Sequence, residues 1–332
     1  MTFKPFSFLA LATALLLATG CGHQQKIHEL LDAGTEAQDN ENYPEAIRDY
    51  SEVLKLDSKS VEAHLQRGTA FVITGEFDRG ISDLSRAIRL DPTNATAYEM
   101  RGYAYFGKDE QAKALSDYNT VLGMEPDNVR VLKMRGKAFY WRRDYTNALI
   151  DLTKALQFET NDAEIYDDRG QCFYQQKQVA WATADFDAAL RIDPEDTTAL
   201  YARSFILYKG GRYAEAAGGF ATVIRLKPKQ VTTYNELAWL LATCPDDVVR
   251  NGAKAITLAT KACNLSKWKR YADIDTLAAA YAETGDFDSA LKYQKQAAEM
   301  DGIPAKNRAG VLQRLDLYSH HKPYRESGQS AD

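Results

Sequence analysis

Histidine, cysteine and serine side chains could support metal or nucleophilic chemistry, but their spacing in this 332-residue sequence fits neither. None of the histidines stands at helical ligand spacing from another, or beside a cysteine in a metal motif. The sequence contains no Gly-x-x-x-x-Gly-Lys loop, no Gly-x-Gly-x-x-Gly fingerprint and no nucleophile in a recognisable context. We therefore expect a protein that is not an enzyme and that carries no metal or cofactor. The histidines are His23, His28, His64, His320 and His321.

The N-terminus carries an apolar run that indicates export. Lys4 precedes thirteen residues, 6–18, that are apolar except for one serine and one threonine. A run of this length is too short to span a bilayer, which needs about 20 residues. It is typical of the apolar region of a secretory signal peptide, which we place at residues 1–20.

Cys21 follows the small residues Ala18, Thr19 and Gly20. This arrangement resembles the lipobox of bacterial lipoproteins, although the family prefers leucine where Ala18 stands. The resemblance implies that Cys21 receives lipid and that residues 21–26 form a lipidated linker. Gly22 is not the aspartate that usually retains lipoproteins in the inner membrane, so the expected location is the outer membrane, facing the periplasm. The alternative is an ordinary secretory signal that leaves Cys21 as a free thiol.

The charge and composition exclude several other classes of protein. The chain has 41 basic and 46 acidic residues and a formal net charge of −5. That balance gives no electrostatic reason to expect nucleic acid as a partner. With four cysteines and nine prolines, the chain is neither a disulfide scaffold nor a proline-rich segment.

A period of 34 residues organises most of the sequence. The dipeptide Arg-Gly recurs at 67–68, 101–102, 135–136 and 169–170, and counting each unit from seven residues before its glycine gives six units without an insertion. Position 20 of each unit is small, position 24 is large and apolar or aromatic, and position 32 is proline in four units. The units are 27–60, 61–94, 95–128, 129–162, 163–196 and 197–230.

This pattern resembles the tetratricopeptide repeat, a 34-residue helix–turn–helix with small residues at positions 8, 20 and 27 and proline at position 32. The resemblance implies an all-α, right-handed superhelical solenoid. Gly at position 8 and Ala at position 20 let the first helix (helix A) and second helix (helix B) of a unit approach closely. Proline at position 32 cannot continue a helix, so it ends the unit.

Two further units and a closing helix follow the six regular ones. Residues 231–270 form a unit six residues longer than the others, and residues 271–302 form the eighth, so that the array spans 27–302. The amphipathic stretch 303–319 is expected to cover the last apolar face as a capping helix. The polar residues 320–332 are expected to be disordered.

Arginine recurs at position 7 of units two to six, and aspartate at position 23 of units one to five. If each aspartate pairs with the arginine of the next unit, 18 residues on, all ten charges are used. We therefore predict an ion-pair ladder between units; the alternative is that both sets are solvated surface residues. The pairs are Asp49–Arg67, Asp83–Arg101, Asp117–Arg135, Asp151–Arg169 and Asp185–Arg203.

Cys244 and Cys263 could form a disulfide in an oxidising compartment. Cys244 is expected where helix A of its unit ends, and Cys263 near the end of the antiparallel helix B. These positions lie at opposite ends of the hairpin, on the order of 15 Å apart at 1.5 Å per residue. A disulfide needs Cα atoms within about 7 Å, so we expect free thiols, although the long loop of this unit leaves the pairing open.

In tetratricopeptide arrays, positions 2, 5, 9, 12 and 13 of helix A line the concave surface. Carried over to this sequence, these positions give an aromatic groove in which a basic band lies beside the acidic Glu164 and Asp167. Tyrosine and tryptophan are frequent interface anchors, so the groove suits an extended peptide or a helix; the alternative is that the rings pack between helices. The groove residues are Tyr103, Phe106, Arg130, Lys133, Lys137, Tyr140, Trp141, Tyr174, Tyr201, Phe205, Tyr208 and Trp239.

These features predict a membrane-anchored scaffold for protein–protein interaction, with a protein or peptide partner in the groove and a role in cell-envelope assembly. A second hypothesis is an accessory subunit that docks an envelope hydrolase or a peptidoglycan enzyme. A third is catalysis or ligand transport in the groove itself. The sequence leaves the identity of the partner and the oligomeric state open.

Overall fold

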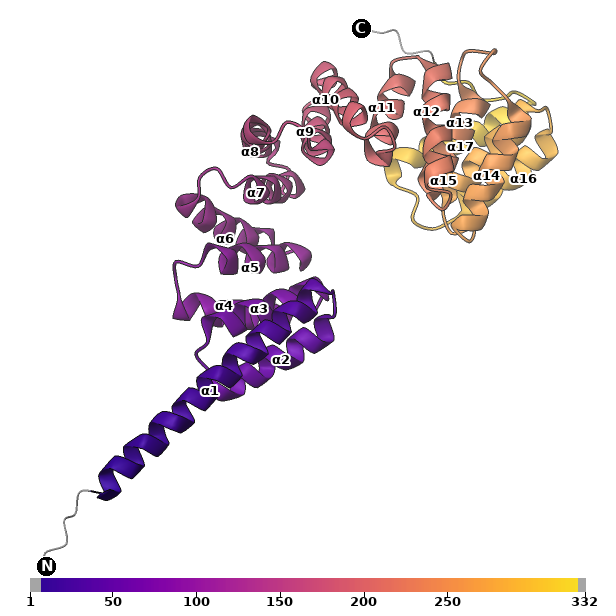
Figure 1. Cartoon of the computed structure of the whole chain (residues 1–332). Coiled ribbons are helices and arrows are strands. Elements are labelled where there is room, and N and C mark those ends of the chain that lie inside the picture. Colours follow the sequence, from indigo (N-terminus) through magenta and orange to yellow (C-terminus); the bar gives the residue numbers. More distant parts are fainter. Residues whose placement is uncertain (1–6, 328–332) are drawn as a thin grey trace, which may run out of the picture. The chain divides into compact units, whose positions relative to one another are not determined.

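A computed structural model describes residues 7–327 of the chain, with side chains from Gly22 onward. Over these residues the secondary structure is entirely α-helical (Figure 1), as the repeat pattern predicted. The helices are α1 Ser7–Asp39, α2 Tyr43–Leu56, α3 Val61–Ile73, α4 Phe77–Leu90, α5 Ala95–Gly107, α6 Gln111–Met124, α7 Val129–Trp141, α8 Tyr145–Phe158, α9 Ala163–Gln175, α10 Val179–Ile192, α11 Thr197–Lys209, α12 Tyr213–Leu226, α13 Val231–Thr243, α14 Gly252–Leu265, α15 Tyr271–Glu283, α16 Phe287–Glu299 and α17 Ala305–Ser319.

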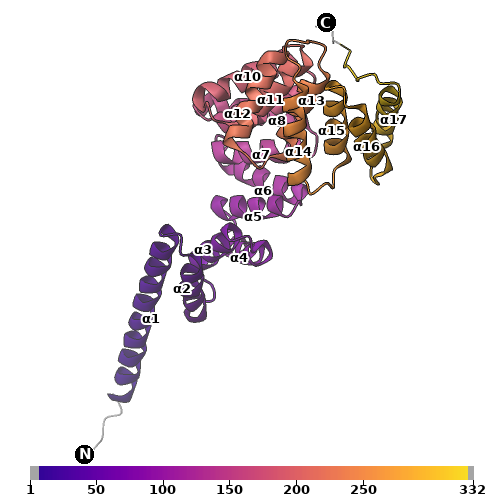
Figure 2. The same cartoon turned by 90° about the vertical axis from the view of Figure 1, so that its right-hand side faces the viewer.

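The first sixteen helices form eight antiparallel hairpins, each made of an odd-numbered helix A and the even-numbered helix B that follows it. The chain divides into two compact units at residues 160 and 161. The first unit holds the hairpins from α1 to α8, and the second holds those from α9 to α16 together with α17 (Figure 2). Within each unit, consecutive hairpins stack on their neighbours.

Helix α1 is much longer than the other helices, with 33 residues. It passes without a break through residues 21–26, which the sequence predicted as a linker. No proline interrupts this stretch, and Gly20 and Gly22 lower helix propensity without ending the helix. Both views show its N-terminal half extending beyond the other helices of its unit (Figures 1 and 2). Among the described residues, no helix is both long and apolar enough to cross a membrane.

Glycine at position 8 of the first five hairpins marks the closest approach of the two helices in each of them. A Cβ atom added at Gly102 would lie 2.7 Å from Cε1 of Tyr118, and one added at Gly34 would lie 2.6 Å from Cε1 of Tyr50. Both tyrosines are fully buried. The large residue at position 24 therefore fills the space that a side chain at position 8 would need.

The connections between helices also repeat with the period. The residue before helix A, at position 34, caps it: the side chain of Asn94 accepts a hydrogen bond from the amide of Ala97, and Asn128 does the same for Val131. Such caps satisfy amide groups that have no partner inside the helix. The turn from helix A to helix B contains one residue of positive φ in each regular hairpin. These residues are Glu41, Gly75, Asp109, Arg143, Lys177 and Gly211.

The arginines at position 7 do form ion pairs, but none of them with the aspartate that the sequence predicted. Arg101 donates from Nε and Nη2 to both carboxylate oxygens of Asp117 in its own hairpin, at 2.8 and 2.7 Å. Its Nη1 donates to the hydroxyl of Ser85, at position 25 of the preceding hairpin, at 3.1 Å. The prediction of inter-unit carboxylate pairs is therefore wrong. The same bidentate geometry joins Arg67 to Asp83, Arg135 to Asp151 and Arg169 to Asp185.

Asp49 and Arg203 take no part in these bidentate pairs, because each lacks the usual partner in its own hairpin. The first hairpin has alanine at position 7, so Asp49 accepts instead from Nε of the adjacent Arg48 at 3.1 Å. In the sixth hairpin, Gly219 replaces aspartate at position 23. A Cβ at Gly219 would lie 2.0 Å from the hydroxyl oxygen of Ser204, which stands where other hairpins have glycine. Arg203 consequently pairs with Asp187 at position 25 of the preceding hairpin, the only pair in the series that is inter-unit among the described contacts.

Helix α17 closes the second unit, within the range 303–319 expected for a capping helix. Its Val311 and Tyr318 are buried against the preceding hairpin. The buried amide of Gln294 in α16 donates to the backbone carbonyl of Val311 at 2.9 Å and to Asp275 of α15 at 2.7 Å. The last apolar face of the array is therefore covered by a helix that is also hydrogen-bonded to it.

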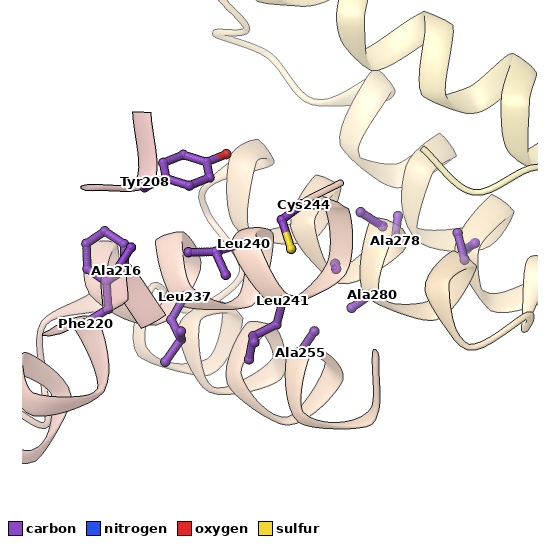
Figure 3. Packing of buried hydrophobic residues seen from close by; sticks show 14 of the residues in the cluster. Tyr208, Ala216, Phe220, Leu237, Leu240, Leu241, Cys244, Ala255, Ala278 and Ala280 are labelled. Carbon is purple, nitrogen blue, oxygen red and sulfur yellow. The ribbon is translucent and has the colours of Figure 1, made fainter. Parts of the chain in front are cut away.

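Cys172, Cys244 and Cys263 are buried free thiols. Cys244 belongs to the cluster of buried side chains from α11 to α17 (Figure 3), whereas Cys263 belongs to a separate one. Burial raises the pKa of all three thiols, to about 11 for Cys244 and about 12 for the other two. They act as small apolar residues, since the reactive form of a cysteine is the thiolate.

We expect Gly102→Ala to lower the free energy of unfolding by about 1–3 kcal/mol, because the added methyl overlaps the buried ring of Tyr118. Gly123→Ala in α6 is the matched control, since a Cβ there meets nothing within 4 Å. Alanine is the better helix former, so the control should be neutral or more stable by up to about 1 kcal/mol. Urea denaturation followed by circular dichroism measures both. Equal effects of the two substitutions would contradict the close approach.

We expect Arg101→Met to cost about 3–5 kcal/mol, because it leaves the buried carboxylate of Asp117 without its bidentate partner. The double variant Arg101→Met/Asp117→Leu should recover most of that loss. A second cycle, which combines Arg101→Met with Asp83→Leu, serves as the control for pairing between hairpins. A coupling energy in the Arg101–Asp117 cycle no larger than that in the control cycle would contradict pairing within the hairpin.

Candidate functional site

The predicted groove residues of the first unit lie on α5 and α7. Tyr103 and Trp141 are exposed, with 45% and 65% of their surfaces accessible, which is unusual for aromatic side chains. Arg130 is exposed too, but its guanidinium forms an ion pair with the buried Glu99 at position 5 of the preceding hairpin. The predicted basic band is therefore partly neutralised at Arg130. Phe106, Lys133, Lys137 and Tyr140 are half-buried.

In the second unit, three of the predicted groove residues form a row of rings along α9 and α11. The ring centroids of Tyr174 and Phe205 are 6.4 Å apart, and those of Phe205 and Tyr208 are 6.3 Å apart, both edge to face. Lys209 lies over the last two rings, with its Nζ 4.9 Å from the centroid of Tyr208. Tyr201 instead packs on the buried ring of Phe220, 5.7 Å away, so it contributes mainly to the contact between helices.

The C-terminal tail lies on this surface, so the expectation that residues 320–332 are disordered is wrong for residues 320–327; residues 328–332 are outside the described part. Glu326 makes three hydrogen bonds. Its amide donates to the carbonyl of Thr243 at 2.9 Å, and its carboxylate accepts from Nε1 of Trp239 at 2.9 Å and from the hydroxyl of Tyr208. Two predicted groove residues thus bind one carboxylate of the chain itself.

Tyr324, two residues earlier in the tail, packs on the same tryptophan. The ring centroids of Tyr324 and Trp239 are 5.7 Å apart. The guanidinium of Arg314 in α17 lies 5.1 Å from the ring centroid of Trp239 and 5.4 Å from that of Tyr324. Arg314 is itself held by two hydrogen bonds to Asp275, at 2.9 and 2.8 Å. A cation over aromatic faces is attracted by their electron density, so these groups stabilise one another.

Arg325 lies between Tyr324 and Glu326 in the tail and contacts a different part of the second unit. Its guanidinium forms an ion pair with Glu283 at the end of α15. The same carboxylate accepts from Nε of Arg250 at 3.1 Å. Arg250 also donates to the backbone carbonyls of Cys244 and Pro245, both at 2.9 Å, and so holds the loop that lengthens the seventh hairpin. The sequence did not predict a role for this loop, and the structure places it beside the tail.

Electrostatics around the tail favour the neutral form of the groups that receive it. Burial raises the pKa of Tyr208, and the nearby Glu326 carboxylate raises it further. Burial likewise raises the pKa of Glu236, which lies on α13 beside Trp239. Tyr208 therefore stays protonated, and its hydroxyl donates a hydrogen bond to the Glu326 carboxylate.

A polar hollow of about 360 Å³ adjoins Trp239 on the side of α15 and α17. Asn235, Glu236, Asp275, Lys306 and Arg314 contribute to its wall. It combines charges of both signs with amide groups, which is suited to polar side chains of a bound segment. Among the described residues, no cluster of His, Cys, Asp or Glu could hold a metal ion.

The acidic part of the predicted surface contains one strongly perturbed carboxyl group. Asp167, at position 5 of the fifth hairpin, is buried. Burial and the neighbouring Asp196 carboxylate raise the pKa of Asp167 to about 8, with smaller contributions from Asp168 and Glu164. Asp167 is therefore largely protonated at neutral pH and does not add a full negative charge to the groove.

Some of these residues could not be identified from the repeat pattern. Glu283, Arg314 and the tail residues 324–326 lie outside the family's concave positions or outside the repeats. The one available signal was Tyr324, an aromatic residue in an otherwise polar tail. Exposed or isolated aromatic residues in polar segments often mark contacts.

Two family models, both described as tetratricopeptide repeat, match the chain. One matches residues 31–95, 65–119 and 168–231, and the other matches residues 276–303. Together they cover more than half of the chain, and the chain belongs to the tetratricopeptide repeat family. No curated protein matches it.

Solved structures of repeat proteins show the same fold. The C-terminal part of a tetratricopeptide repeat-containing protein from Cytophaga hutchinsonii is 18% identical, with a TM-score of 0.58; the match covers 74% of this chain and 99% of that one. A tetratricopeptide repeat protein from Parabacteroides merdae is 20% identical, with a TM-score of 0.55, and the match covers 78% and 99% of the two chains. At these identities the similarity concerns the fold alone.

The raised pKa of Asp167 predicts a stability that depends on pH. Because its folded-state pKa of about 8 lies above the value of about 4 in an unfolded chain, the folded protein binds more protons between these values. Stability should therefore fall as the pH rises from about 4 to 8. Asp167→Asn should remove this contribution, so that at pH 8 the variant melts at least about 2 °C above the wild type, and at pH 5 it does not.

Asp288→Asn, at an exposed position in the same unit, is the control and should keep the pH profile of the wild type. Differential scanning fluorimetry at pH 5 to 8.5 measures all three proteins. A profile of Asp167→Asn parallel to that of the wild type would show that Asp167 titrates in its ordinary range.

Proposed function

We propose that this protein is an envelope scaffold that binds segments of a protein partner on its helix A surfaces and is held at the membrane by lipid on Cys21. One observation carries the binding part of the proposal. A polypeptide segment, the tail, lies on the helix A aromatics of the second unit and bonds to them through both its backbone and its side chains. A surface with this chemistry is suited to polypeptide rather than to a small apolar ligand.

The first unit supports the proposal independently. Tyr103 and Trp141 expose large rings on its helix A positions. Exposed aromatic residues of this kind contribute large contact area at a small cost in side-chain entropy and are common energetic centres of interfaces. Family members use the corresponding positions for partners, which favours protein binding over catalysis.

The membrane part of the proposal rests on the sequence around Cys21. The apolar run 6–18 and the small residues before Cys21 fit export followed by lipid attachment, and attachment through more than one acyl chain is stable. Gly22 in place of aspartate favours the outer membrane and the periplasmic side. Only residues 22–26 separate Cys21 from the first repeat unit, which begins at residue 27, and this short spacing would keep the array close to the membrane surface.

Crosslinking in the native host, followed by mass spectrometry of what is captured from membranes, tests the proposal. We expect Trp141→Ala to reduce capture of the partner at least about tenfold, because loss of a central interface tryptophan costs about 2 kcal/mol or more. Trp181→Ala is the matched control: this tryptophan is exposed to the same extent, 65%, but lies on a helix B. Capture that is unchanged by Trp141→Ala, or absent from the wild type, would contradict the binding function.

Membrane fractionation and labelling with palmitate test the anchor. Cys21→Ser should move the protein from the membrane fraction to the soluble fraction and abolish incorporation of labelled palmitate, while binding of the purified partner stays intact. Palmitate incorporation that persists in Cys21→Ser would exclude this residue as the attachment site.

A further inference from the structure

The tail does more than cover apolar surface, because three consecutive residues occupy three different chemical environments. We infer that this site recognises an extended segment of a partner in which an aromatic residue, a basic residue and a carboxylate follow one another, and that the tail fills the site in cis until such a segment displaces it. The inference rests on the proposed function, since it names the chemistry and the regulation of that peptide-binding surface.

The carboxylate position is the most selective of the three. Tyr208 is 5% exposed, and its hydroxyl and Nε1 of Trp239 donate to different oxygens of the Glu326 carboxylate. Both groups are neutral donors. An apolar or basic side chain in this position would leave two partly buried donors without an acceptor, which is costly. Lys209, close to the ring of Tyr208, adds positive charge nearby.

The aromatic position depends on groups that are already fixed by the fold. Trp239 provides a flat surface for the ring of Tyr324, and the guanidinium of Arg314 lies near both rings. Asp275 holds that guanidinium with two hydrogen bonds that do not involve the ring of Tyr324. A segment with tyrosine, phenylalanine or tryptophan here would meet a surface that needs little reorganisation.

The basic position is formed by groups other than those that bind the aromatic ring and the carboxylate. Glu283 receives Arg325, and Arg250 keeps the carboxylate of Glu283 in place. Between these positions, the bond from the amide of Glu326 to the carbonyl of Thr243 involves only backbone atoms. It fixes the register of any extended segment, whereas the three side-chain positions select its sequence.

The tail is suited to be displaced. It leaves α17 after Ser319 and reaches Glu326 within seven residues, and His321, Lys322 and Ser327 are exposed. A ligand tethered this closely acts at an effective concentration of about 1 mM. If the tail itself binds the site with an intrinsic Kd of about 0.1 mM, it weakens the apparent binding of a competing segment about tenfold.

Fluorescence anisotropy with a labelled peptide of residues 321–327 tests this in the full chain. The variant Tyr324→Ala/Glu326→Ala should vacate the site and bind the peptide about tenfold more tightly than the wild type. Lys322→Ala is the matched tail control, and it should bind the peptide as weakly as the wild type. A peptide with Glu326→Gln should lose at least about tenfold in affinity for the vacated site, because the carboxylate acceptor is gone.

Hydrogen exchange gives a second readout that does not depend on the variants. In the wild type, the amide of Glu326 should exchange more slowly than an unstructured amide, and saturating peptide in trans should speed it up. Peptide binding equal in the wild type and the vacated variant, or no binding to the vacated variant, would overturn the inference. So would unprotected exchange at Glu326.

These outcomes are distinct from failure of the proposed function. Partner capture can depend on Trp141 and yet be the same with and without the double substitution in the tail. That result would support the scaffold and contradict only the proposed regulation. If the peptide displaces the tail in trans but no partner is captured in a Trp141-dependent way, the peptide site is supported and the scaffold function is contradicted.

Discussion

The fold of the first five hairpins depends on the distance between their two helices, which is set by glycine at position 8 and a large residue at position 24. Where Gly102 faces Tyr118, not even a methyl group fits between them. The neighbouring positions use the same closeness: Arg101 precedes the glycine and Asp117 precedes the ring, so the two charges meet in bidentate geometry. Because the third nitrogen of Arg101 reaches Ser85 of the preceding hairpin, one short contact also helps to fix how consecutive hairpins stack.

Much of this architecture could be predicted from the sequence, because a period repeated six times without an insertion averages out the ambiguity of any one helix. The ion pairs could not, although their residues were identified. Counting charges showed an offset of one unit, which favoured pairing between hairpins. The offset arises from substitutions at the two ends of the series: alanine in the first hairpin, and Ser204 with Gly219 in the sixth. A count of charges contains no information about the distances between side chains, and these distances decide which residues pair.

The candidate site could be predicted only in part, because the sequence pattern again contains no distances between side chains. The family's concave positions identified Tyr208 and Trp239, which bind the tail, but also Tyr201, which packs on Phe220. Periodicity gives the face of a helix on which a residue lies and says nothing about how far a neighbouring helix covers that face. The tail itself carries no periodic signal. Its described part, residues 320–327, is short and mostly polar, and the bonds of Glu326 join it to helices far away in the sequence.

Those contacts change how the second unit can open. In an array of stacked hairpins each repeat touches its neighbours, so stability is local and the ends fray first. The bond from Tyr208 to Glu326 joins residues 118 apart, and it ties the end of the chain back to α11 across two intervening hairpins. Opening of the last hairpins therefore requires loss of the tail contacts at the same time. The hairpins from α11 to α16 should therefore open together, whereas the hairpins of the first unit carry no such tie and can melt one after another.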